Sequence, residues 1–259
     1  GMHGRERWHG VRVVARAACS LAALVLAALP GQAQVAPKQP VDLELILAID
    51  VSGSIDEFEA KLQRQGYQTA LLNPKVTDAI RSGPLGRIAL TYFEWAGEDH
   101  QVSVVDWTMV DGAESAAMFV GTLAENPPVS GRRTSISAAI DFAMQRFAKS
   151  PFEGTRRVID VSGDGHNNSG RPLEEARSGA LAQGVTINGL PIVNDRPGPF
   201  GWPAAVELDK YFESNVIGGP RAFMIVANSF NDFAEAILSK LIREIAWQPS
   251  DAGDMAALP

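Results

Sequence analysis

The chain has 259 residues, enough for one large domain or two small ones. Its 46% hydrophobic and 20% charged content is that of an ordinary globular protein, which excludes a disordered or membrane-embedded chain. The net charge of −7, without any run of Lys and Arg, argues against a nucleic-acid partner held by its phosphates.

The first 33 residues have the pattern of a secretory signal peptide. A basic start is followed by an apolar run from Ala17 to Leu29 and by small residues that favour cleavage after Ala33. The run is shorter than the roughly 20 residues that span a bilayer, so no membrane span is expected after cleavage. An uncleaved anchor is the alternative. We therefore expect an exported protein, periplasmic or secreted.

The only cysteine, Cys19, lies near the beginning of the apolar run. A lipid-modified cysteine would lie at its end, so the position argues against a lipoprotein. The mature chain, without cysteine, can form no disulfide.

A short linker is expected at 34–41, and apolar periodicity then predicts alternating strands and helices. In chain order, the expected elements are a strand at Val41–Ile49, helices at Asp56–Leu72 and Pro74–Ser82, strands at Arg87–Trp95 and Gln101–Val110, a helix at Gly112–Ala124, a helix bearing the stripe Ile136 to Phe147, a strand at Val158–Ser162, a helix between Pro172 and Gly184, strands at Val185–Val193 and Ala222–Ala227, and a helix at Phe233–Ile245.

This alternation predicts an α/β fold with a doubly wound, mostly parallel six-stranded sheet and helices on both faces. Five residues separate the strands Arg87–Trp95 and Gln101–Val110, so we expect them to pair as a hairpin with one antiparallel edge strand. The domain is expected to cover 42–247, with a flexible tail at 248–259. Ligands of such sheets bind beyond the carboxyl ends of the strands.

Oxygen-bearing side chains are concentrated at these strand ends. The first strand ends in Asp50-Val-Ser52-Gly-Ser54, the fourth is followed by Asp164, and Thr134 precedes a helix between them. The set resembles the metal-ion-dependent adhesion site (MIDAS) of von Willebrand factor A (vWA) domains. A helix-capping turn formed by Ser54 is the structural alternative for the first loop.

The resemblance covers roughly residues 42–246 and implies a bound divalent cation. It implies that Ser52, Ser54 and Thr134 bind the metal directly and that Asp50 and Asp164 hold it directly or through water. Hard oxygen ligands favour Mg²⁺, or Mn²⁺ and Ca²⁺, and the absence of Cys and suitable His excludes a zinc site. With only two carboxylates on the ion, an Asp or Glu from a partner protein can complete its coordination.

Three further segments resemble a narrower group. Phe93–Gly97, Arg157–Gly165 and Val216–Pro220 are similar to signatures of a secreted bacterial family with a single vWA domain and no assigned function.

Several residues are expected around the metal. His166 and Asn167 follow Asp164, and the 194–203 segment with Arg196 and Trp202 leaves the fifth strand at its carboxyl end, so all four are candidates for a partner-contact rim. Glu94 ends the second strand and is a candidate for the same rim or for a group close behind the metal.

Asp160 lies in the middle of a strand, where an unpaired carboxylate is costly. We expect a structural ion pair, with Arg156 or Arg157 as its partner.

The expected function is therefore a non-enzymatic, metal-dependent protein-binding module. A metal-dependent hydrolase is the runner-up, but only His166 or Glu94 could act as its base and no Gly-x-Ser-x-Gly elbow is present. A regulatory subunit of an envelope complex, whose last helix moves when the metal gains a ligand, is the third hypothesis. No Gly-x-Gly-x-x-Gly follows the first strand, which argues against a dinucleotide cofactor.

Overall fold

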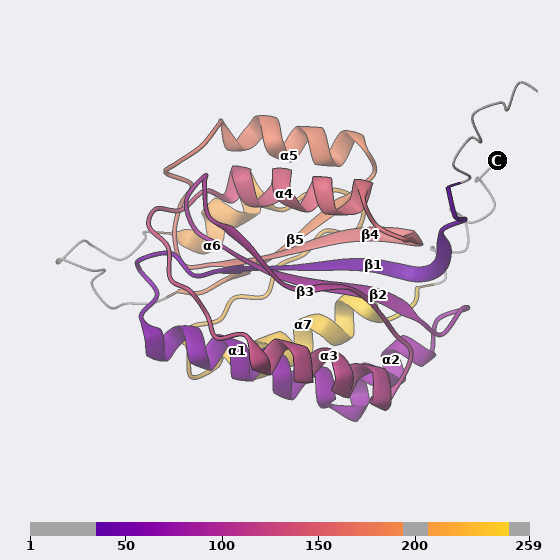
Figure 1. Ribbon diagram of the computed structural model, residues 1–259. Helices are drawn as coiled ribbons and strands as arrows, with labels where there is room; N and C mark the ends of the chain where they lie inside the picture. Colours follow the sequence, from indigo (N-terminus) through magenta and orange to yellow (C-terminus); the bar gives the residue numbers. More distant parts are fainter. Residues whose placement is uncertain (1–34, 194–206, 249–259) are drawn as a thin grey trace, which may run out of the picture. The chain divides into compact units, whose positions relative to one another are not determined.

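A five-stranded mixed sheet lies at the centre of the computed structural model, which describes residues 35–193 and 207–248 (Figure 1). Across the sheet the strands are β3 (Gln101–Val110), β2 (Ile88–Trp95), β1 (Gln39–Asp50), β4 (Phe152–Gly163) and β5 (Thr186–Pro191). All neighbours are parallel except β2 and β3. The antiparallel edge strand is thereby confirmed, and β1 takes in the last three residues of the predicted 34–41 linker.

The prediction of a sixth strand at Ala222–Ala227 is wrong. This segment lies along β5, but only isolated bridges join it to Gly189 and Ile192. The N–H of Ile225 donates to the Gly189 carbonyl at 3.1 Å, and the next bond of a regular ladder would require an N–H on Pro191. Proline has none, so the ladder is interrupted.

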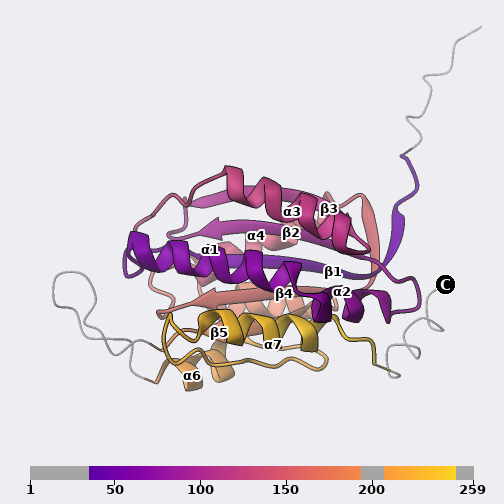
Figure 2. The same cartoon turned by 90° about the horizontal axis from the view of Figure 1, so that it is seen from below.

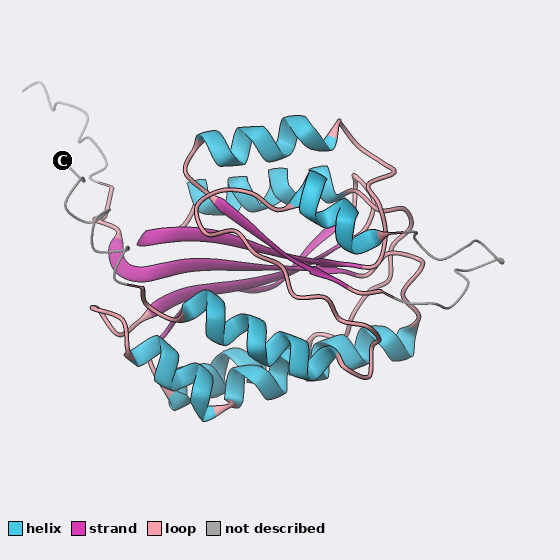
Figure 3. Ribbon diagram, turned by 180° about the vertical axis from the view of Figure 1, so that it is seen from behind, coloured by secondary structure: helices cyan, strands magenta, loops and turns pink. Residues whose placement is uncertain are grey.

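Helices cover both faces of the sheet (Figures 1, 2 and 3). On one face lie α1 (Glu57–Leu72), α2 (Pro74–Arg81), α3 (Ala113–Glu125) and α7 (Phe233–Ile245). On the other lie α4 (Ile136–Ala148), α5 (Leu173–Ala182), the short α6 (Leu208–Tyr211) and the π-helix η2 (Phe212–Val216). None of the helices in the described ranges is long and apolar enough to cross a membrane.

The central strand β1 explains this three-layer arrangement. Its apolar side chains alternate between the two faces, with Leu45 and Leu47 in the core beneath α1 and α7 and Ile46 and Ala48 in the core beneath α4. All four are fully buried. The near-continuous apolar run therefore belongs to a strand covered on both faces, as predicted.

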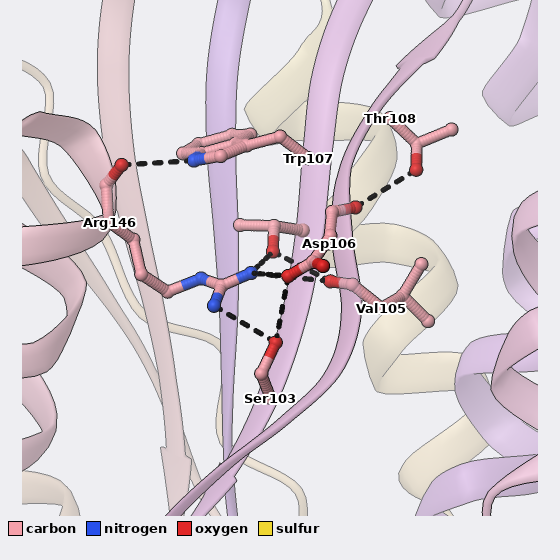
Figure 4. A network of polar contacts seen from close by, with 7 residues as sticks. Ser103, Val105, Asp106, Trp107, Thr108 and Arg146 are labelled. Atoms are coloured by element: carbon pink, nitrogen blue, oxygen red, sulfur yellow. Dashed lines mark hydrogen bonds and ion pairs between the residues drawn. The ribbon is translucent and has the colours of Figure 1, made fainter. Parts of the chain in front are cut away.

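The half-exposed edge strand β3 is held by one arginine of α4 (Figure 4). The Arg146 guanidinium donates to Ser103 Oγ at 3.0 Å and to the Thr91 hydroxyl, and lies 3.3 Å from the Asp106 carboxylate. In return, Trp107 Nε1 donates to the Arg146 carbonyl at 3.0 Å. These bonds fix the edge strand against α4.

A buried ion cluster joins α7 to the sheet. Lys240 Nζ lies 2.5 Å from both Asp160 Oδ1 and Glu244 Oε1, and all three side chains are at most 1% exposed. Asp160 therefore has a structural partner, but not the predicted one. Arg157 lies on the other face of the strand, and Arg156, four residues or about 13 Å away, donates to the Glu244 carbonyl instead.

The cluster predicts a pH dependence of stability. Burial, and then the charge of Asp160, raise the pKa of Glu244 from 4.5 to about 8, although Lys240 opposes them and Tyr67 packs nearby. The folded state therefore binds this proton more tightly than the unfolded chain, and the resulting stabilisation is complete below about pH 4.5 and lost as the pH rises through 8. The free energy of unfolding should fall over this window by at most about 1.4 kcal/mol per pH unit.

Urea unfolding of the wild type and of E244Q at several pH values in EDTA measures this contribution. The difference between the two proteins should change with pH, because other shifted carboxyl groups such as Asp50 are common to both. Parallel curves would contradict the assignment to Glu244.

Candidate metal centre

The predicted metal-binding residues lie where two neighbouring parallel strands end. Asp50 is the last residue of β1, and Asp164 directly follows β4. Because β1 pairs with β4 in parallel, both carboxylates reach the same edge of the sheet. The chain connections diverge between these two strands, which is where open α/β sheets form a crevice for ligands.

Hydrogen bonds join four of the five predicted residues. Asp50 Oδ1 accepts the N–H of Ser52 at 2.7 Å, and Asp50 Oδ2 lies 3.4 Å from the N–H of Asp164. Ser54 Oγ donates to Asp164 Oδ1 at 2.5 Å and lies 3.2 Å from Ser52 Oγ. A compact group of two carboxylates and two hydroxyls therefore exists at this edge.

Thr134, the fifth residue, is positioned by Asn168, which follows His166 and Asn167 in the loop after Asp164. The N–H of Thr134 donates to Asn168 Oδ1 at 2.9 Å, and the N–H of Asn168 donates back to the Thr134 carbonyl at 2.8 Å. A Cβ on Gly165 would lie 3.7 Å from Thr134 Oγ1, so the threonine hydroxyl lies against the loop that follows β4. The structure thus brings all five predicted residues to one edge.

The helix-capping alternative for Ser54 is wrong. Asp56 is the N-cap of α1 and accepts the N–H of Glu59 at 2.8 Å, while the Glu59 carboxylate accepts the N–H of Asp56 at 3.0 Å. This capping box satisfies the start of the helix without Ser54. The Ser54 hydroxyl is therefore not used as a cap and donates its hydrogen bond to Asp164.

Without a cation nearby, the ionised forms of Asp50 and Asp164 are electrostatically unfavourable. Burial, and then the charge of Asp164, raise the pKa of Asp50 to about 8. Burial is also the main cause that raises the pKa of Asp164 to about 6, with a contribution from Glu59. No cationic side chain of the described residues lowers either pKa. A cation bound beside the pair would therefore stabilise its ionised form.

In the described ranges, no three His, Cys, Asp or Glu side chains lie close enough to hold a metal together. The cluster would therefore depend on hydroxyl oxygens for half or more of its protein ligands. Such an oxygen-only set suits hard divalent cations.

Glu94 does not lie on the rim. It is 2% exposed, and its carboxylate is ion-paired with Arg64 of α1. Arg64 Nη1 also donates to the carbonyls of Leu123, at 2.7 Å, and Asn126 at the end of α3. The Glu94 side chain faces the helix layer, where Arg64, about two turns into α1, compensates its charge.

The other predicted rim residues differ in exposure and in the contacts they form. His166 is exposed and stacks on Tyr211, with ring centres 4.0 Å apart and planes at 10°. Asn167 is partly buried and its N–H donates to the Tyr211 hydroxyl at 3.1 Å, so it supports the loop. Arg196 and Trp202 lie outside the described residues.

A cavity of about 1260 Å³ lies elsewhere, around the amino-terminal half of β4 and the end of α7. Its lining includes Glu44, Arg157 and Arg243 but none of the five oxygen-bearing residues. The candidate metal centre is therefore a separate, largely buried cluster at the opposite end of the strands.

Comparison with known proteins supports the fold. The model of the family "Protein of unknown function (DUF1194)" matches residues 40–249. No curated protein matches the sequence.

Several solved structures share the fold at low sequence identity. Proximal thread matrix protein 1 from the mussel byssus, described with a zinc-occupied MIDAS motif, has a TM-score of 0.57 and 15% identity over 79% of this chain and 48% of its own. A vWA protein from Catenulispora acidiphila has a TM-score of 0.55 and 15% identity over 80% and 43%. BatB from Bacteroides thetaiotaomicron has a TM-score of 0.52 and 20% identity over 78% and 98%. The chain thus spans about half the length of the first two, and the likeness establishes a vWA-like α/β fold.

Proposed function

The chain belongs to the family "Protein of unknown function (DUF1194)", and we propose that it is an exported protein-binding module that uses a divalent cation to recognise a carboxylate of a partner protein. Ser52, Ser54 and Thr134 would hold the metal directly, and Asp50 and Asp164 directly or through water. The bound cation would supply a positive charge with one coordination position left for the partner's Asp or Glu.

The proximity of two carboxylates, Asp50 buried and Asp164 partly exposed, carries this proposal. Asp50 and Asp164 lie side by side, next to two serine hydroxyls, and no cationic side chain of the described residues forms an ion pair or hydrogen bond with either carboxylate. The donor set fits a hard cation, because every candidate ligand is an oxygen. The zinc-occupied motif of the mussel protein, which shares the fold, is a reason to include Zn²⁺ among the candidate ions.

The surroundings favour binding over hydrolysis. A hydrolase would need a base beside the ion, and Glu94 is committed to a buried pair with Arg64. His166, the other candidate, is stacked on Tyr211. A regulatory role for the last helix remains the alternative, and it would use the same metal site.

Melting temperatures in EDTA and across titrations of Mg²⁺, Mn²⁺, Ca²⁺ and Zn²⁺ test the metal site. At 100 times its dissociation constant, a specific ion should stabilise the fold by about 2.7 kcal/mol, or roughly 5–10 °C for a domain of this size. The rise should be absent in D50A, because this variant removes a carboxylate at the centre of the cluster.

D141A is the matched control, since Asp141 is a surface carboxylate of α4 that pairs with Arg171. Its metal response should equal that of the wild type. A metal-induced rise that persists in D50A, or no rise with any of the four ions, would overturn the proposal.

A further inference from the structure

Two exposed arginines stand next to the candidate metal centre. Arg132 and Arg133 precede Thr134 in the loop between α3 and α4, and both side chains are exposed. Neither guanidinium forms an ion pair, hydrogen bond or ring contact with any other residue in the described ranges. In a chain with a net charge of −7, two uncompensated cations at one site need an explanation.

The loop that carries them is rigidly held. The N–H of Gly131 donates to the Val51 carbonyl at 3.0 Å, and the N–H of Ser135 donates to the Ala96 carbonyl at 2.7 Å. A Cβ on Gly131 would lie 2.5 Å from the Ala96 side chain, so only glycine fits this close approach. The backbone of Arg132 and Arg133 is therefore fixed between the loops that follow β1 and β2.

Arg133 is held in a backbone conformation that its side chain disfavours. Its φ is +62°, in the left-handed region where glycine is the usual residue. A residue with a Cβ costs stability there, and such strain is concentrated at functional sites. Glycine would suit this position better for folding alone.

We propose that Arg132 and Arg133 select partners whose metal-binding carboxylate is flanked by further acidic residues. This inference rests on the proposed metal site and adds the chemistry of the partner. Arg132 and Arg133 lie directly before Thr134 in the chain, so their loop adjoins the candidate metal centre. The acidic Glu98 and Asp99 of the neighbouring turn form no ion pair with either arginine, which leaves both charges available to the partner.

Two synthetic peptides provide the test. One has a single central glutamate among serine and glycine, and the other has three consecutive glutamates at the same length. Calorimetry with the full chain in Mg²⁺ should show tighter binding of the triglutamate peptide. R132Q and R133G should each weaken that peptide about three- to tenfold and leave the single-glutamate peptide unchanged, because each removes one charged hydrogen-bond donor.

The melting temperature in EDTA provides a second readout that needs no metal. R133G should melt roughly 2 °C higher than the wild type, because glycine relieves the left-handed strain. R221G is the control for affinity, since Arg221 has a similar φ of +58° and lies far from Thr134 in the chain. It should leave both affinities unchanged.

The outcomes separate the two proposals. Peptide binding that EDTA abolishes but R132Q and R133G do not weaken would overturn the role of the arginines and leave the metal site standing. Failure of both peptides to bind in the presence of any of the four cations would overturn both. A loss of stability in R133G would show that the arginine is a structural residue and contradict the inference.

Discussion

Replacing Lys240 with methionine should lower the free energy of unfolding by about 3–5 kcal/mol, as is typical when one member of a buried ion pair is removed. Lys240 is the positive charge between Asp160 and Glu244, and its Nζ lies 2.5 Å from each carboxylate. Without it, the Asp160 carboxylate remains in the core without its cation, beside Glu244, whose pKa of about 8 keeps it mostly protonated at neutral pH. The loss of stability arises from the uncompensated charge of Asp160 more than from the lost attraction to Lys240.

Urea unfolding at neutral pH measures the effect, and two further variants test its cause. K210M is the control, since Lys210 forms an exposed pair with Glu207 and should change stability by less than about 1 kcal/mol. The triple variant D160N, K240M and E244Q should recover much of the loss, because no buried charge is left unpaired. A triple variant as unstable as K240M would show that packing of the lysine chain, and not charge, dominates.

Replacing Arg64 with methionine should have an effect of similar size, about 3–5 kcal/mol. The guanidinium pairs with the buried Glu94 and also donates to the carbonyls of Leu123 and Asn126. Three acceptors would lose their partner at once, and an unsatisfied buried acceptor is costly. The arginine also joins α1 to the end of α3, and so supports the loop that leads to Thr134.

Unfolding of R64M, E94Q and the double variant forms a cycle that isolates the ion pair. The double variant should be more stable than the sum of the single changes predicts, because glutamine does not require a cation. R171M, which removes an exposed arginine paired with Asp141, should have little effect. Strict additivity in the cycle would contradict coupling between Arg64 and Glu94.

Local patterns determined the elements and the order of the oxygen-bearing residues. The apolar run of β1 predicts a strand buried on both faces, and the four-residue repeat of Phe233, Ile237, Leu241 and Ile245 predicts α7, since both patterns follow from backbone geometry. Parallel neighbouring strands then require that Asp50 and Asp164 end at one edge. For these features, information within one element and the direction of the strands was enough.

Which cation pairs with each buried carboxylate was decided only by the tertiary structure. Glu94 finds Arg64, which lies 30 residues earlier in the chain, and Asp160 finds Lys240 on the last helix, because buried charges pair with whichever cation the packed helices bring opposite them. Sequence proximity favoured Arg156 or Arg157 for Asp160. Arg156 lies four residues away on the same strand, too far to meet it, and Arg157 lies on the other face. The predicted sixth strand likewise fails to form a ladder with β5, because Pro191 has no N–H to donate. That effect depends on which residue lies opposite Pro191 at the sheet edge.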